Sequence, residues 1–233
     1  MNNQYHCPVC DICHTYKSNA VPLGDGLYCQ ECYTKADPVH KLKAIALPMG
    51  LTTIANVVLD DARFPVWSGS SKPHQHHYGK GGLAQHTFEV VDLCLKNNAF
   101  FNTCAEGVQN KAVPFHQLFL AALFHDAGKM WDYEPTNADQ TEWQGSSHKR
   151  HIHHISRSGI VWSKAWDAHP MTTVNSDEWH DAVLHAILAH HQLREWGSPV
   201  SPNTRLAWLL HLCDGISARM DDGERWDRHK DGK

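Results

Sequence analysis

The sequence has no apolar run of the roughly 20 residues that a membrane-spanning helix needs, and no basic-then-apolar segment of the kind that opens a secreted chain. We therefore expect a protein without membrane contact, located in the cytoplasm. A large charge excess is also missing, because 21 basic and 25 acidic residues leave a formal net charge of -4. The chain as a whole is thus not a strongly basic nucleic-acid binder, although a local basic patch stays open. With 42% apolar and 20% charged residues, the 233 residues favour one large folded domain plus a small one over disorder.

Histidine, by contrast, is abundant, with 20 residues. Imidazole is the commonest metal ligand among side chains, so this excess points to metal sites. Near the middle of the chain an apolar run, residues 118–124, ends in His125-Asp126, and Gly128 and Lys129 follow. An ionised carboxylate buried beside an imidazole is costly unless it is paired or holds a metal. His125 and Asp126 are therefore either a hydrogen-bonded core pair or two metal ligands.

Five of the 8 cysteines lie close together at the start of the chain, in Cys-x-x-Cys pairs separated by a glycine-containing loop. This spacing is typical of a tetrahedral zinc site. Residues 1–36 are thus predicted to form a module like a zinc ribbon or treble clef, stabilised largely by its metal. The preferred ligands are Cys10, Cys13, Cys29 and Cys32, and Cys7 is an alternative to one of the first two.

Two disulfides in a secreted protein are the alternative explanation of these cysteines. The missing leader and three more cysteines further along the chain, Cys94, Cys104 and Cys213, argue against it. A contact with a protein or nucleic acid through the zinc module stays open.

The rest of the chain reads as helical. Apolar spacing predicts helices over residues 37–63 (interrupted near 48–50), 83–96, 114–124, 148–166, 177–191 and 203–220, with glycines bending the chain before residue 83. Residues 37–220 should therefore form one all-α domain. Residues 221–233 are a charged tail that we expect to fray.

Two polar residues lie within apolar helix faces. His86 falls between Leu83 and Val90 on the apolar side of its helix, so its ring should point inward. Asp214 interrupts the apolar run of the last helix, although aspartate is a poor helix former. A buried aspartate there needs a partner, and a cation held with other helices would supply one.

The remaining histidines occur in two groups. His148, His151 and His154 are spaced by three, which places them on one face of a continuous helix. His190 and His191 are adjacent, and adjacent helical residues diverge by about 100°. Both can reach one metal only if the helix ends there, which the following loop makes plausible.

The ordered set of these residues resembles the HD superfamily of metal-dependent phosphohydrolases, an all-helical fold, over roughly residues 42–220. Residues 76–87 look like the segment before the first ligand in YhaM-type 3′-to-5′ exoribonucleases, and residues 184–191 with 195–200 look like their fifth motif. HD domains of plasmid mobilisation relaxases share the first stretch. The chain departs from the YhaM type in having cysteine pairs where those enzymes carry an OB-fold for single-stranded RNA.

The resemblance implies a two-metal centre. Asp126 would bridge the metals, which are Mn, Fe, Ni or Zn by ligand chemistry. His86, His125 and Asp214 would complete one site, and His154, His190 and His191 the other. His154, before Ile155 and Ser156, matches the third motif best, and His151 is the alternative.

The same resemblance suggests residues that contact substrate. Lys129 would stabilise charge on the phosphoryl group, unless it is only a solvated lysine at a helix end. His76 and His77 are candidates for contacts with a substrate phosphate or its leaving group. Arg194 and Arg205 are weaker candidates.

Three functions follow from this resemblance. The first is a phosphodiesterase, possibly a 3′-to-5′ exonuclease, on single-stranded RNA or DNA. The second is a hydrolase of free nucleotides or cyclic dinucleotides, although no Gly-Tyr-Pro follows His190-His191 as in the HD-GYP type. The third is a non-enzymatic protein of a mobile element that binds DNA or a partner. The sequence does not predict the oligomeric state.

Overall fold

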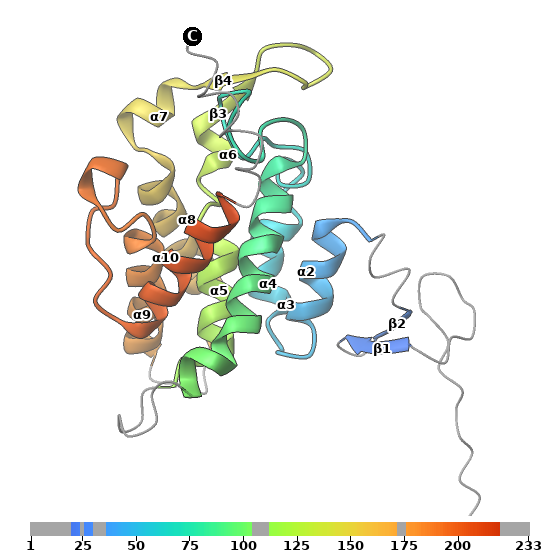
Figure 1. The fold of residues 1–233 in the computed structure, drawn as a ribbon, viewed down its shortest axis with the longest axis vertical. Coiled ribbons are helices and arrows are strands. Elements are labelled where there is room, and N and C mark those ends of the chain that lie inside the picture. Colours follow the sequence, from blue (N-terminus) through green and yellow to red (C-terminus); the bar gives the residue numbers. More distant parts are fainter. Residues whose placement is uncertain (1–19, 24–25, 30–35, 104–111, 172–175, 220–233) are drawn as a thin grey trace, which may run out of the picture.

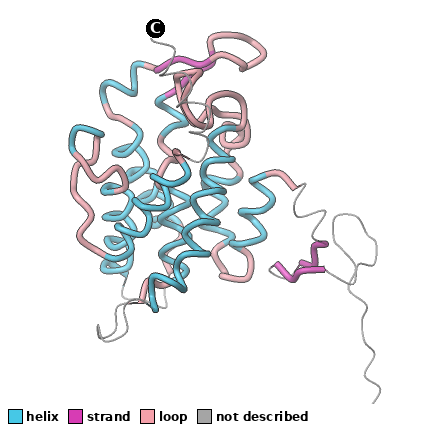
Figure 2. The backbone as a smooth tube through the Cα atoms, in the orientation of Figure 1, coloured by secondary structure: helices cyan, strands magenta, loops and turns pink. Residues whose placement is uncertain are grey.

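The computed structural model describes residues 20–23, 26–29, 36–103, 112–171 and 176–219. Helices dominate this part of the chain and strands are few (Figures 1 and 2). The helical prediction for the large domain is therefore confirmed. None of the helices in the described ranges is both long and apolar enough to cross a membrane.

The cysteine-rich start contributes only a short hairpin to the description. Strand β1 (Ala20–Leu23) pairs antiparallel with β2 (Gly26–Cys29), with Ala20 opposite Cys29. Cys7, Cys10, Cys13 and Cys32 lie outside the described residues, and of Cys29 only the backbone is described. The structural zinc site thus stays a prediction.

Helix α5 (Phe115–Phe124) forms the centre of the core, and in Figure 1 it runs through the middle of the bundle. It is apolar on all sides from residue 118 to 124, and all seven of these side chains are fully buried, as expected for a helix surrounded by others. Packed against it are α3 (Thr52–Leu59), α4 (Gly82–Thr103), α8 (His154–Ala168), α9 (Ser176–Ala189) and α10 (Arg205–Ser217), while α2 (Pro38–Ala46) covers α3 and α4. The polar residues at the ends of these helices can therefore meet beyond the end of α5.

The predicted continuous helix over residues 148–166 is wrong. The structure has α7 (Ser147–His151) and α8, separated at His153, whose φ of 67° is left-handed. The cause is Asp132, which lies elsewhere in the chain and accepts hydrogen bonds from the His154 backbone N–H (2.8 Å) and from His148 Nδ1 (2.8 Å). Asp132 thereby caps the start of α8 from outside. As a result His148, His151 and His154 do not share one helix face.

Two further elements differ from the prediction. Helix α4 continues seven residues beyond 96, and its buried Asn98 donates to the Val113 carbonyl oxygen before α5. After α6 (Lys129–Asp132), β3 (Tyr133–Pro135) and β4 (Trp143–Gly145) form an unpredicted hairpin. Three-residue strands carry too little alternation to be found by pattern. The edge-on contact of Trp143 with Trp67 (ring centroids 5.0 Å apart) helps to hold the hairpin.

Helix α9 ends two residues before the predicted end at residue 191, which meets the condition for His190 and His191 to reach one metal. The helix stops at Ala189, so His190 and His191 lie in the turn that follows. A short 3-10 helix, η1 (Arg194–Trp196), and a loop then lead to α10. Because the chain leaves helical geometry after Ala189, the two adjacent rings are free of the 100° divergence that a helix would impose.

Candidate metal centre

Asp126 lies in the turn after α5 and is almost completely buried, at 1% exposure. Its Oδ2 lies 3.1 Å from His86 Nε2 and 3.3 Å from His125 Nε2. Its other oxygen, Oδ1, lies 3.4 Å from His154 Nε2 and 3.7 Å from His190 Nε2. The two oxygens of one carboxylate therefore face two different groups of histidines.

These groups coincide with the two ligand sets that the sequence resemblance implies. One ligand atom from each of His86, His125, Asp126 and Asp214 lies within 4.8 Å of the others, and the same holds for His154, His190 and His191. The candidate ligands come from three helices, α4, α8 and α10, and from two turns, one after α5 and one after α9. Asp214 Oδ1, for example, reaches from α10 to within 3.1 Å of His86 Nε2 on α4.

The far nitrogen of each ring is held in place. Since a carbonyl oxygen only accepts hydrogen bonds, an Nδ1 paired with one carries the proton, and the neutral ring presents the lone pair of Nε2 to the centre. Three of the rings are fixed in this way at 2.7 Å: His125 by Ala122, His190 by Ile187 and His191 by Trp196.

Side chains hold the other two rings, and the sequence analysis did not find them. Asp132 Oδ2 accepts from His154 Nδ1 at 3.1 Å. On the other side, the Ser217 hydroxyl lies 3.1 Å from His86 Nδ1 and donates to Glu89 at 3.0 Å. Burial raises the pKa of Glu89, but its hydrogen bonds, led by His77, lower it to about 2, so this acceptor stays ionised. No pattern in the sequence marks these residues, because their partners are far away in the chain.

The residues fit a divalent metal. Asp126 Oδ1 and the Nε2 atoms of His154 and His190 are buried without a hydrogen-bond partner among the described residues, whereas Asp126 Oδ2 forms an ion pair with Lys129. Lone pairs converging in a buried space are unfavourable unless a cation lies between them. Mixed imidazole and carboxylate donors suit Mn, Fe, Ni or Zn.

The local electrostatics keep Asp126, His154 and His190 in the protonation states that a metal needs. For His86, burial lowers the pKa, but hydrogen bonds to Asp126 and Asp214 outweigh this and raise it. Burial raises the pKa of Asp126, but Lys129 and His125 outweigh it and hold this pKa well below its usual range. Burial lowers the pKa of His154 to about 4, and it lowers that of His190 well below the usual value. The carboxylate is therefore ionised, and these two rings are neutral, at neutral pH.

Lys129 belongs to the site rather than to the solvent. Its ammonium lies 2.6 Å from Asp126 Oδ2 as an ion pair, and its side chain is 13% exposed. Burial lowers its pKa, but Asp126 and other neighbours outweigh this and raise it, so Lys129 stays a cation. The interpretation of Lys129 as a solvated helix-end lysine is therefore wrong.

A cavity of about 340 Å³ leads from the surface to the centre. Its wall includes Lys129 and Arg219, which are basic, and Tyr133, whose pKa burial raises so that the hydroxyl keeps its proton. The other lining residues are Gly69, Ser70, Gln75, His76, His154, His191 and Ala218. An anion entering the cavity would thus meet two cations and a hydroxyl donor.

The remaining candidate residues lie as follows. His76 lines the cavity, whereas His77 is not among its lining residues and pairs with Glu89 at 3.0 Å. His151 is exposed and belongs to neither ligand group. Arg194 is exposed in η1, and Arg205 donates to the Phe101 carbonyl oxygen; neither lines the cavity.

The family model described as "HD domain" matches residues 83–219, which is more than half of the chain and includes every residue of the two ligand groups. No solved structure matches the chain.

Proposed function

Because this chain belongs to the HD domain family, whose members are metal-dependent phosphohydrolases, we propose that it hydrolyses phosphodiester bonds of nucleotides at the ends of single-stranded RNA or DNA. The observation that carries the proposal is the position of Asp126. Its two buried oxygens face two groups of inward-directed Nε2 atoms, which is the arrangement expected of a carboxylate shared by two metals. Metals bound there would supply a water of lowered pKa and neutralise phosphate charge.

The chain itself contributes binding and charge. Lys129 and Arg219 both line the cavity and attract the phosphate, and Lys129 is placed to donate a hydrogen bond to a phosphate oxygen as charge develops on it. The Tyr133 hydroxyl, which stays protonated, offers a further donor. Asp132 holds the His154 ring so that its lone pair faces inward. These groups orient a phosphate and shield it from bulk water.

The substrate assignment rests on the segment before the first ligand. Residues 76–87 resemble the corresponding segment of exoribonucleases, and His76 borders the cavity. A cavity of about 340 Å³ can hold a terminal nucleotide phosphate and its sugar but not a duplex. A single-stranded end therefore suits the site.

Metal analysis and turnover test the proposal together. Wild-type protein should contain about three metals per chain, one zinc in the cysteine module and two in the centre. Asp126→Ala should keep only the zinc and lose all turnover while its circular dichroism stays unchanged. The exposed residue Asp139 provides a matched control, Asp139→Ala, which should behave as wild type.

End-labelled single-stranded oligonucleotides with Mn²⁺ decide the substrate. A ladder shortening from the 3′ end supports the exonuclease. Cleavage of free or cyclic nucleotides alone would favour the second function and replace the polymer substrate. A metal-loaded protein that cleaves none of them would contradict the proposal and favour a binding protein, especially if Asp126→Ala keeps its nucleic-acid affinity.

A further inference from the structure

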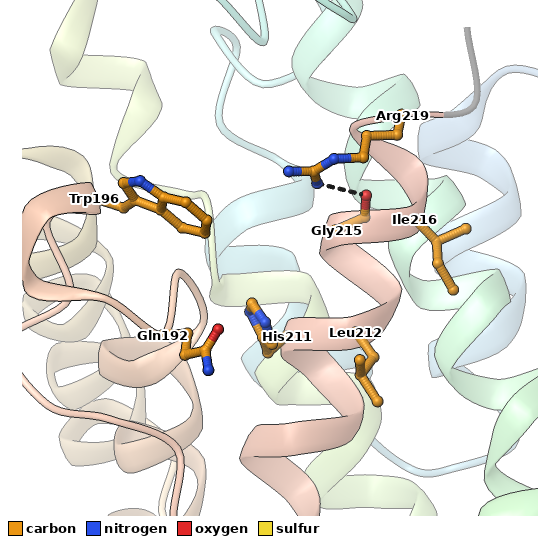
Figure 3. A pocket seen from close by; sticks show the side chains of 7 residues that line it. All are labelled: Gln192, Trp196, His211, Leu212, Gly215, Ile216 and Arg219. Atoms are coloured by element: carbon orange, nitrogen blue, oxygen red, sulfur yellow. Dashed lines mark hydrogen bonds between the residues drawn. The ribbon is translucent and has the colours of Figure 1, made fainter. Parts of the chain in front are cut away.

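A second cavity, of about 540 Å³, shares a lining residue with the metal cavity, and Figure 3 shows the side chains around it. Arg219 lines both, so the two cavities border each other at this residue. In Figure 3 the Trp196 ring projects from the segment after α9. On the other side, His211 projects from α10 and Arg219 from the turn that follows it. A ligand whose phosphate occupied the first cavity would extend into the second.

The wall of the second cavity is largely apolar, with a few polar groups. Trp196, Leu212 and Ile216 expose 52%, 48% and 49% of their surface and lie together in the wall of this cavity. Gln192 and His211 add side chains that can donate or accept hydrogen bonds. A flat aromatic surface with polar groups beside it suits a planar heterocycle with polar edges.

Both sides of the second cavity are fixed to the metal centre through the backbone. The Trp196 carbonyl oxygen accepts from His191 Nδ1, and His211 Nδ1 donates to the His190 carbonyl oxygen, each at 2.7 Å. The aromatic platform therefore stands at a set position relative to two candidate ligands. Such preorganisation is what a subsite for one part of a substrate requires.

We propose that this second cavity binds the nucleobase of the nucleotide whose phosphate lies in the metal cavity, an inference that rests on the proposed function. The base stacks on the Trp196 ring, and Gln192 and His211 contact its polar edge. Arg219, at the junction of the two cavities, carries the positive charge that the phosphate requires. Stacking tolerates any base, so the subsite favours nucleotides over other phosphates without reading sequence.

Equilibrium binding tests this inference separately from catalysis. The probes are adenosine 5′-monophosphate and ribose 5-phosphate, which share the phosphate and sugar but differ in the base, measured by calorimetry on Mn²⁺-loaded protein. Wild type should bind the nucleotide roughly 5- to 150-fold more tightly, the range that base stacking supplies. Trp196→Ala should abolish this preference while leaving ribose 5-phosphate affinity unchanged, and Trp196→Phe should retain most of it.

Phe100→Ala is the matched control, because Phe100 is a highly exposed aromatic residue that lines neither cavity. A wild type without preference for the nucleotide, or a Trp196→Ala preference equal to wild type, would overturn the inference. An equal loss for both probes in Trp196→Ala would show that the ring only supports His191, and would also overturn it. If the protein prefers the nucleotide but cleaves no phosphodiester, the base subsite is supported and the proposed function is contradicted.

Discussion

At the scale of single residues, side chains behind the candidate ligands fix the orientation of the ligand rings. Asp132 is fully buried and accepts from His154 twice, through the backbone N–H and Nδ1, and from His148 Nδ1. One carboxylate therefore starts helix α8 and orients the ring that faces Asp126 Oδ1. Asp132 would therefore act on a bound metal indirectly, by positioning the His154 ring.

Replacing Asp132 by asparagine tests this role. The amide keeps the shape but loses the charge that strengthens both hydrogen bonds from His154, and its NH₂ group then faces the third donor, His148 Nδ1. The His154 ring is therefore held less firmly. We expect Mn²⁺ affinity to fall by about 10- to 100-fold, with activity restored at high Mn²⁺. Titration calorimetry and activity against metal concentration measure the two effects.

Glu134→Gln is the matched control for Asp132→Asn. Glu134 is an exposed carboxylate two residues further along the chain. Within the described residues, its side chain accepts a hydrogen bond from Gln144. Its Mn²⁺ affinity should equal that of wild type. An Asp132→Asn protein with wild-type affinity would refute the positioning role.

At the scale of elements, the close approach of α8 to the turn after α5 brings the two histidine groups together. Gly128 has φ of -64°, an ordinary helical value, so its backbone conformation does not require glycine. Space does: a Cβ there would lie 2.1 Å from the His154 carbonyl oxygen. The contact is with backbone, which cannot move aside like a flexible side chain, and the Gly128 N–H also donates to Ser158 Oγ at 2.9 Å.

Gly128→Ala should therefore push α8 away from Asp126. We expect a loss of about 1–3 kcal/mol in the free energy of unfolding, the usual effect of overpacking a tight contact. Metal should also be lost from the His154, His190 and His191 group before the other group. Urea unfolding and metal content measure both.

Gly145→Ala controls for added side-chain bulk, because its Cβ would meet only the Lys149 side chain, at 3.3 Å. It should unfold within about 0.5 kcal/mol of wild type. If Gly128→Ala matched it in stability and metal content, the close approach would not matter to the site.

The sequence predicts elements well where local pattern decides them, and poorly where distant partners do. Helix α5 was predictable because an apolar run of this length must be buried. The candidate ligands were predicted from the resemblance of their order along the chain. The break at His153 was not predictable, since Asp132 creates it from 21 residues away, and Ser217 became visible only once α10 lay against α4.

At the scale of the whole molecule, the metal centre joins helices that are distant in sequence. The two ligand groups come from α4, α8 and α10 and from the turns after α5 and α9. Several buried acceptor atoms of these two groups have no hydrogen-bond partner among the described residues. A bound metal would relieve this unfavourable burial and link all five helices, so it should stabilise the entire domain.

We therefore expect Mn²⁺ to raise the melting temperature. At a free concentration 100-fold above Kd, one site contributes about 2.7 kcal/mol, which for a domain of this size corresponds to a shift of roughly 5–10 °C. Adding Mn²⁺ is more informative than removing all metal with a chelator, because a chelator would also strip the predicted zinc from the cysteine module. Asp126→Ala removes the shared carboxylate and should show almost no shift. Equal shifts in the two proteins would mean that Mn²⁺ stabilises the domain by binding at another site. The five helices would then not be linked through a metal at Asp126.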